Sequence, residues 1–348
     1  MSPASLDILQ VGLVLIGSLL GSRAQTSRLV RNIFFVLLAV SSLYIGYVGL
    51  NLLSPELAKT SSISAANRHA LAITYCSAAA ASGVLLMPST RRLLVRLSGW
   101  NMETPLSFLG VWLFVVVFLI NVATIIQLSA YYITISYVGL DQHYQLFNTL
   151  LQQLCYILIA LIGAGIYYRR RPRAVFQRLG VLSQEQAMAA PGEEEEARER
   201  ISTLNCIGSI TVIALGSLAL GFGGILLVKS FMYRLYLPLS FAFSTMLPPP
   251  PGSGLLLLAT ALGIGIIASA GEELLFRGLL QPTFGLVPTA LLFTALHGQY
   301  GLSPALGFIF LQGLGYGWLR NRYGTWASLA AHVVYTTIAV LLWWMVFR

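Results

Sequence analysis

The sequence predicts an all-α, polytopic membrane protein with about ten transmembrane helices. Of its 348 residues, 57% are hydrophobic and only 9% are charged, which is far from the usage of soluble globular domains. Apolar runs long enough to cross a hydrocarbon core of about 30 Å recur along the chain, and they lack the alternation of β-strands. We therefore expect helices that span a lipid bilayer, so that the bilayer itself is a partner of the protein.

The apolar runs define ten candidate spans, of which the eighth is short. They cover residues 8–21, 33–53, 70–88, 107–127, 146–168, 204–228, 254–281, 287–297, 304–319 and 325–347. The positive charges of the first run follow it instead of preceding it, so we expect a retained helix and not a signal peptide. Four consecutive prolines at 248–251 predict a stiff connector before the seventh span. Pro282 and Pro288 bound the turn between the seventh and eighth spans.

Arginine falls in alternate loops between these spans. The four clusters are Arg23, Arg28 and Arg31; Arg91, Arg92 and Arg96; Arg169 to Arg171, Arg173 and Arg178; and Arg320 and Arg322. Cytoplasmic loops are enriched in arginine and lysine, so both termini are expected outside, in a prokaryotic plasma membrane. The net charge of +9 is thus a topology signal and does not predict a nucleic-acid partner.

Charge and apolar content divide the chain into three parts. Residues 1–168 form an N-terminal membrane region of five helices, and residues 204–348 form a C-terminal membrane domain. Between them, residues 169–203 carry blocks of arginine and glutamate, which predict a solvated cytoplasmic linker rather than a docking site. Cys76, Cys155 and Cys206 stand singly and predict neither a disulfide framework nor a zinc knuckle.

The C-terminal domain contains few acidic and imidazole side chains. After residue 201, its only carboxylates are Glu272 and Glu273, and its only histidines are His297 and His332. All four lie in apolar segments, where a charge costs about 2.5 to 3.5 kcal/mol, so they are expected to face a protein interior or a water cavity.

Helix geometry predicts that three of these side chains meet. Counted from the turns that end their helices, Glu272, His297 and His332 lie about 14, 15 and 12 Å into the membrane. Glu273 and Arg277 are four residues apart, the spacing of a helical ion pair. Glu272 lies about 100° around the helix and is left free to point elsewhere.

A desolvated glutamate beside two imidazoles suits peptide hydrolysis. The carboxylate can take a proton from water, while the imidazoles donate to the developing oxyanion. Alternatively, Glu272, His297 and His332 could bind a divalent metal ion such as Zn²⁺, which would activate the water. Other intramembrane protease classes fit poorly, because the chain has no HExxH motif and its only aspartates are Asp7 and Asp141.

Three motifs in order resemble the CPBP family, the CAAX-prenyl-protease and bacteriocin-processing intramembrane proteases that include Rce1-type enzymes. The motifs are EExxxR at 272–277, FxxxH at 293–297 and a last helix that contains His332, all within about residues 254–346. The sequence around the motifs is also similar to that family, in the segments GEELLFRG, LLFTALHG and GTWASLAAHVVYT. No such resemblance is found for the N-terminal five spans.

The resemblance implies an endopeptidase that acts on a membrane-associated protein or peptide. Glu272 matches the glutamate that activates water, Glu273 and Arg277 match its supporting pair, and His297 and His332 match the two histidines. Family members have been described both with and without a metal. Thr336 is a weak auxiliary donor where the family usually has asparagine, since a hydroxyl reaches less far than an amide.

Two other functions are compatible with the same residues. The carboxylates could relay protons in an ion- or proton-coupled transporter, although the two halves show no convincing internal repeat. Thr336 also leaves open a non-proteolytic CPBP-like protein that acts as a membrane scaffold or immunity factor.

Overall fold

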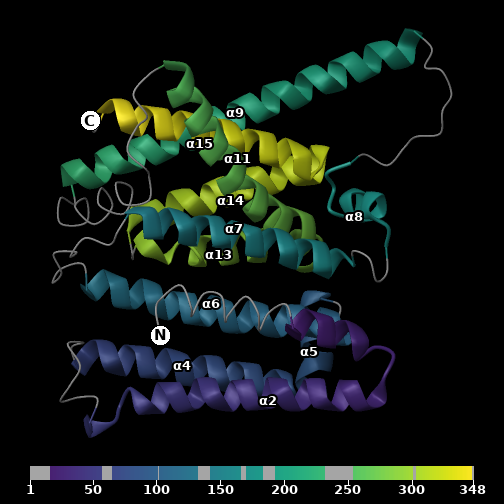
Figure 1. Ribbon diagram of the computed structural model, residues 1–348, viewed down its shortest axis with the longest axis vertical. Coiled ribbons are helices and arrows are strands. Elements are labelled where there is room, and N and C mark those ends of the chain that lie inside the picture. The colour runs from purple at the N-terminus through teal and green to yellow at the C-terminus, as the bar shows by residue number, and fades with distance from the viewer. Residues whose placement is uncertain are drawn as a thin grey trace.

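In the computed structural model of the chain, the described residues are 16–56, 65–100, 102–131, 142–165, 170–182, 193–231, 254–300 and 303–346. Every element within these ranges is a helix, so the predicted all-α class is confirmed (Figure 1). The first half contains α2 (Arg28–Asn51), α4 (Ala65–Leu85), α5 (Pro88–Ser98), α6 (Pro105–Tyr131), α7 (Gln142–Ala164) and α8 (Pro172–Arg178). The second half contains α9 (Glu193–Phe231), α11 (Gly254–Glu272), η1 (Glu273–Leu280), α12 (Gln281–Phe284), α13 (Leu286–Ala295), η2 (Gly298–Tyr300), α14 (Pro304–Tyr323) and α15 (Thr325–Val346).

The apolar helices confirm a polytopic membrane protein. Within the described residues, four helical stretches are long and apolar enough to cross a membrane: Arg28–Asn51, Ser202–Gly224, Gly254–Phe284 and Thr325–Met345. A fifth is possible if α4 and α5, which meet at 94°, count as one span. Three other predicted spans coincide with shorter apolar helical stretches, Ser107–Val122, Leu150–Ala164 and Leu286–Ala295. Residues 8–15 of the first predicted span lie outside the described residues.

Helix α9 begins inside the segment predicted as a charged linker. Its first residues, from Glu193, continue without a break into the apolar stretch that follows. The short helix α8 occupies another part of that segment, while residues 183–192 lie outside the described residues, as do the prolines at 248–251. The linker is therefore partly helical where it is described.

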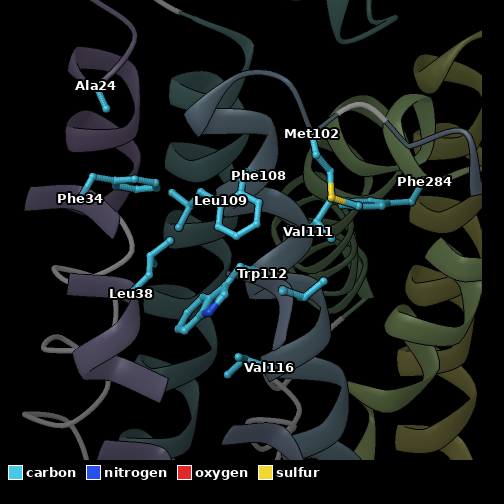
Figure 2. Packing of buried hydrophobic residues seen from close by; sticks show 11 residues of the cluster. Ala24, Phe34, Leu38, Met102, Phe108, Leu109, Val111, Trp112, Val116 and Phe284 are labelled. Carbon is cyan, nitrogen blue, oxygen red and sulfur yellow. The ribbon is translucent and has the colours of Figure 1, made fainter. Parts of the chain in front are cut away.

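The N-terminal helices form a layer of their own beside the motif-bearing helices. Helix α4 packs between α2 and α6, and Figure 1 shows these three helices side by side. The buried side chains between them include Phe34 of α2 and Phe108 and Trp112 of α6, with aromatic and aliphatic groups interdigitated (Figure 2). Phe284 of α12 joins the same cluster, so this apolar core extends from the N-terminal layer to the end of the motif helix.

The C-terminal helices and α7 surround the three sequence motifs. Helix α11 packs against α15, α13 packs against α14, and α9 covers α14 and α15. Helix α7, which precedes the linker in the sequence, packs against both α11 and η1. A helix of the N-terminal half therefore lies directly beside the segment that carries EExxxR.

The turn between α14 and α15 sets the position of the last helix. Gly324 has φ 96°, a value that favours glycine, and a Cβ at this position would lie 2.9 Å from the carbonyl oxygen of Gly180. The backbone N–H of Thr325 donates to that same oxygen at 2.8 Å. These contacts fix the first turn of α15. The same helix carries Ser328 and His332.

Candidate functional site in the C-terminal helices

The EExxxR motif lies across a change in helix type. The sequence predicts one α-helix over residues 254–281, but the α-helix ends at Glu272 and a π-helix runs from Glu273 to Leu280. A π-helix has a wider turn, is rare, and occurs frequently at functional sites. The side chains of the two glutamates therefore project from the helix where its winding changes.

Glu273 is completely buried at the centre of a polar network. Its Oε1 lies 3.3 Å from an Arg277 guanidinium nitrogen and 2.9 Å from Nδ1 of His332. The hydroxyl of Ser328 donates to the other carboxylate oxygen. The predicted Glu273–Arg277 ion pair is thus present, and three side chains compensate for the cost of burying this carboxylate.

Arg277 is also buried, at 1% exposure, and is enclosed by aromatic rings. Its guanidinium carbon lies 4.3 Å from the ring centre of Phe293 and 5.5 Å from that of Tyr316. A further nitrogen is 3.5 Å from the carbonyl oxygen of Gly313. Cation–π contacts and hydrogen bonds from α13 and α14 together hold the arginine beside Glu273.

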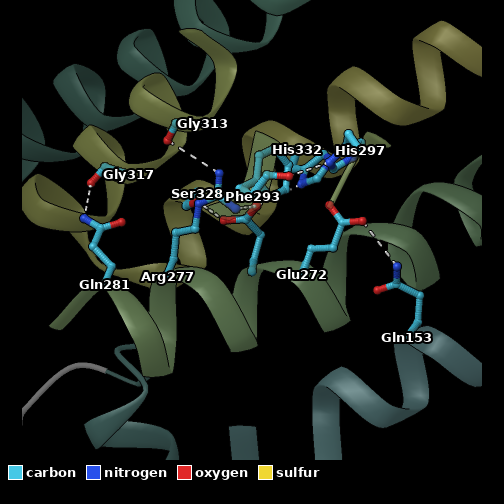
Figure 3. Close-up of polar contacts among 11 residues, drawn as sticks. Gln153, Glu272, Arg277, Gln281, Phe293, His297, Gly313, Gly317, Ser328 and His332 are labelled. Atoms are coloured by element: carbon cyan, nitrogen blue, oxygen red, sulfur yellow. Dashed lines mark hydrogen bonds and ion pairs between the residues drawn. The ribbon is translucent and has the colours of Figure 1, made fainter. Parts of the chain in front are cut away.

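Glu272 is only partly buried and has a different neighbour. The amide nitrogen of Gln153, on α7, donates to its Oε1 at 3.3 Å. Figure 3 shows the Glu272 carboxylate pointing to the side of the motif helix on which His297 and His332 are drawn. The sequence predicts that Glu272 meets the imidazoles, whereas the carboxylate in direct contact with an imidazole is that of Glu273.

Both histidines have their rings close to that of Phe293. The ring of His297 is 4.6 Å from the Phe293 ring and that of His332 is 6.4 Å from it, between ring centres. The ring of His332 also stacks on Tyr316 at 4.8 Å. The structure therefore brings the FxxxH motif and the last helix together, as the predicted depths require.

Hydrogen bonds define the orientation of both imidazoles. Nδ1 of His297 lies 2.8 Å from the carbonyl oxygen of Phe293, and Nδ1 of His332 faces the Glu273 carboxylate. Both partners are acceptors, so Nδ1 carries the hydrogen in each ring. Nε2 is then the atom that each imidazole can offer to a substrate or to water.

Comparison with known families places these residues in one domain. Residues 254–338 match the family model described as "Type II CAAX prenyl endopeptidase Rce1-like". This matched stretch is similar to that family and is named the Rce1-like domain after it. It extends from α11 into α15 and includes every site residue predicted from the sequence.

One curated relative has a shorter stretch of similarity. "Uncharacterized protein YpbD" of Bacillus subtilis (strain 168) is 40% identical over 75 residues, which is 20% of this chain and 38% of that protein. The chain thus matches well under half of the relative's length. No solved structure matches the chain.

The sequence predicts Glu272, His297 and His332 as ligands if the site uses a metal ion. Among the described residues, no three His, Cys, Asp or Glu side chains are grouped so that they could hold a metal ion. A protein-bound zinc ion typically needs at least three protein ligands. A divalent metal ion held by Glu272, His297 and His332 stays a prediction.

Thr336 lies one turn beyond His332 in α15 and is half-buried. It is not among the side chains that contact Glu273 or Arg277. Its predicted part as an auxiliary donor stays a prediction.

Three residues of the site were not predicted from the sequence. Ser328 is four residues before His332, so its place on the same helix face was available from the pattern. Tyr316 is one of several aromatic residues in an apolar stretch and carries no distinguishing signal. Gln153 is a polar residue inside an apolar run, which marks it for a buried contact but does not identify Glu272 as its partner.

Proposed function

We propose that the protein is an intramembrane endopeptidase in which Glu272 activates a water molecule to hydrolyse a peptide bond. The Rce1-like match supports a CAAX-protease-like activity in general. The observation that carries the proposal is the contrast between two adjacent glutamates. Glu273 is enclosed in a polar network, whereas Glu272 is partly accessible and points to the side of the motif helix on which both imidazoles are drawn (Figure 3).

Glu272 is the better general base of the pair. Glu273 already accepts from Ser328 and His332 and faces Arg277, so proton uptake would break several charge-assisted contacts. Among the described residues, Glu272 accepts one hydrogen bond, from the Gln153 amide. Its second carboxylate oxygen can then bind water. A base must reach its proton directly or through water, which favours the carboxylate that is not already enclosed.

The histidines supply the groups that stabilise the reacting carbonyl. When water attacks, its proton passes to Glu272 and negative charge develops on the carbonyl oxygen of the substrate. Nδ1 of His332 already donates to Glu273, so donation from Nε2 to the carbonyl oxygen requires a hydrogen on both ring nitrogens. His297 is held to the backbone of Phe293 and orients the water or the substrate through its Nε2. The proton on Glu272 then transfers to the leaving amine.

The substrate is a membrane-associated protein or peptide. The family description names CAAX prenyl endopeptidases, so a prenylated peptide with a CAAX end is the first substrate class to test. Glu272, Glu273 and His332 lie in helical stretches that are long and apolar enough to cross a membrane, which suits a substrate anchored in the same bilayer. The similarity to a Bacillus subtilis protein agrees with a prokaryotic plasma membrane.

We also propose that both termini face outward. Labelling of a cysteine introduced at Arg92 or at Arg322, from either side of vesicles, would test this orientation.

The direct test is peptide cleavage by the purified full-length chain in lipid nanodiscs. Farnesylated and unmodified forms of one CAAX peptide are incubated with the parent and with Glu272→Gln, and the products are identified by mass spectrometry. We expect the parent to release the terminal tripeptide and Glu272→Gln to lose at least about a hundredfold in rate, the range of general-base catalysis.

A matched control is Glu103→Gln, which removes an exposed carboxylate before α6 and should leave the rate unchanged. Equal cleavage by the parent and Glu272→Gln would exclude Glu272 as the base. Absence of cleavage with both peptide forms would count against CAAX-type hydrolysis by this chain.

A further inference from the structure

Helix α7 presents polar side chains to the motif helix. Gln153 is 3% exposed, and its amide nitrogen donates to Glu272 across 119 residues of sequence (Figure 3). Tyr156, one turn further along, places its ring 6.0 Å from that of Phe276 in η1. One wall of the site thus comes from outside the Rce1-like domain.

The two helices approach closely at Gly271, the residue before Glu272. A Cβ at Gly271 would lie 2.7 Å from the backbone oxygen of Gln153 and would also collide with its side-chain oxygen. Only a glycine therefore lets α7 come near enough for the amide of Gln153 to reach the next residue's carboxylate. The first glycine of GEELLFRG is explained by this contact.

Burial of Gln153 is unfavourable as a purely structural choice. Within the described part of the chain, its side-chain oxygen is buried and has no hydrogen-bond partner. A buried polar atom without a partner costs free energy, and an apolar residue of similar size would avoid that cost. Among the described residues, the Gln153 side chain makes its one polar contact with Glu272.

We propose that Gln153 is a positioning residue for catalysis, which rests on the proposed function of Glu272. Its N–H holds one oxygen of the Glu272 carboxylate, so that the other oxygen faces the water between the glutamate and the imidazoles. Helix α7 is then part of the active site, and the N-terminal membrane region contributes to the chemistry as well as to anchoring. Without this donor, the carboxylate is free to rotate among conformations that are unproductive.

The test compares Gln153→Met with Gln152→Leu in the nanodisc cleavage assay. Methionine keeps the length of glutamine but has no amide. Gln152 is the neighbouring glutamine, is exposed, and donates to the Tyr156 hydroxyl at 3.0 Å instead of to Glu272. Gln153→Met should lower kcat about 10- to 100-fold, the effect of losing a hydrogen bond to a charged group, with KM unchanged. Gln152→Leu should retain the parent's kcat and KM.

A second measurement separates positioning from folding. The thermal midpoints of the parent, Gln153→Met, Glu272→Ala and the double variant form a cycle, and a direct contact predicts non-additive shifts. An unchanged kcat, a change in KM alone, or an equal effect of Gln152→Leu would overturn the positioning role. Failure of both Gln153→Met and Gln153→Leu to fold would also overturn it, in favour of a structural role.

The two proposals fail in different ways. If the parent is inactive, or as active as Glu272→Gln, the proposed function falls and the positioning role falls with it. If Glu272→Gln is inactive while Gln153→Met retains full activity, the proposed function stands and only the role of Gln153 is overturned.

Discussion

At the scale of single residues, the buried pair of Glu273 and Arg277 dominates the energetics of the site. Each ion loses its hydration, and the network recovers that cost through His332, Ser328 and the ring of Phe293. A buried pair of this kind adds little net stability, but removal of one partner leaves the other charged and uncompensated.

Arg277→Met should therefore lower the free energy of unfolding by about 3 to 5 kcal/mol. The loss should be smaller in the double variant Arg277→Met with Glu273→Leu, because no unpaired charge remains. Unfolding in mixed micelles, followed by tryptophan fluorescence, measures both values. The control is Arg322→Met, which removes an exposed arginine from the end of α14. A loss no greater for Arg277→Met than for Arg322→Met would contradict the account.

Local spacing allowed part of this network to be predicted. The Glu273–Arg277 pair follows from a separation of four residues, and the depths of His297 and His332 follow from the helix rise. The partner of His332 did not follow, because the assignment between adjacent glutamates depends on how the helix rotates. The contact of Gln153 with Glu272 joins helices far apart in sequence, which no local pattern specifies.

At the scale of helices, the main unpredicted feature is the π-helical segment from Glu273 to Leu280. Its composition does not distinguish it from an α-helix, because leucine and phenylalanine suit both. The wider winding is compatible with the tertiary contacts at this segment, such as the bond that the Arg320 side chain donates to the backbone carbonyl of Arg277. Directly after the segment, the Gln281 side chain donates to the carbonyl of Gly317. Such contacts appear only once the helices are assembled.

Close packing of α11 on α15 predicts different effects of alanine at two glycines of α11. A Cβ at Gly265 would lie 3.1 Å from the carbonyl oxygen of Val333 and would collide with the hydroxyl of Thr337, whereas a Cβ at Gly263 would meet nothing within 4 Å. Gly265→Ala should cost about 1 to 3 kcal/mol through overpacking. Gly263→Ala should be neutral or slightly stabilising, because alanine favours the helix. Thermal midpoints in the same detergent compare them, and equal midpoints would refute this packing.

At the scale of the whole molecule, the N-terminal layer and the Rce1-like domain are joined around the motif helix. The indole nitrogen of Trp100 donates to the carbonyl oxygen of Phe284 at 3.2 Å, and the Phe284 ring lies 4.8 Å from that of Phe114. Together with α7, these contacts connect both ends of the EExxxR segment to residues outside the domain.

Composition was enough to predict the class of the whole molecule but not the residue at which each helix ends. Hydropathy gives the presence of an apolar run, while the length of a helix depends on where tertiary contacts and turns end it. Helix α4, for example, stops at Leu85 and the chain turns by 94° into α5, whose arginines are exposed or half-buried. The position of α7 beside the site likewise depends on assembly and not on sequence order.

The central claim is that this assembled site uses water to hydrolyse a peptide bond. Cleavage of the farnesylated CAAX peptide in nanodiscs made up in H₂¹⁸O, followed by mass spectrometry, tests it most directly. The account predicts one ¹⁸O atom in the newly formed carboxyl terminus with the parent chain and no labelled product with Glu272→Gln. A cleaved peptide without ¹⁸O, or equal labelling by both chains, would contradict it.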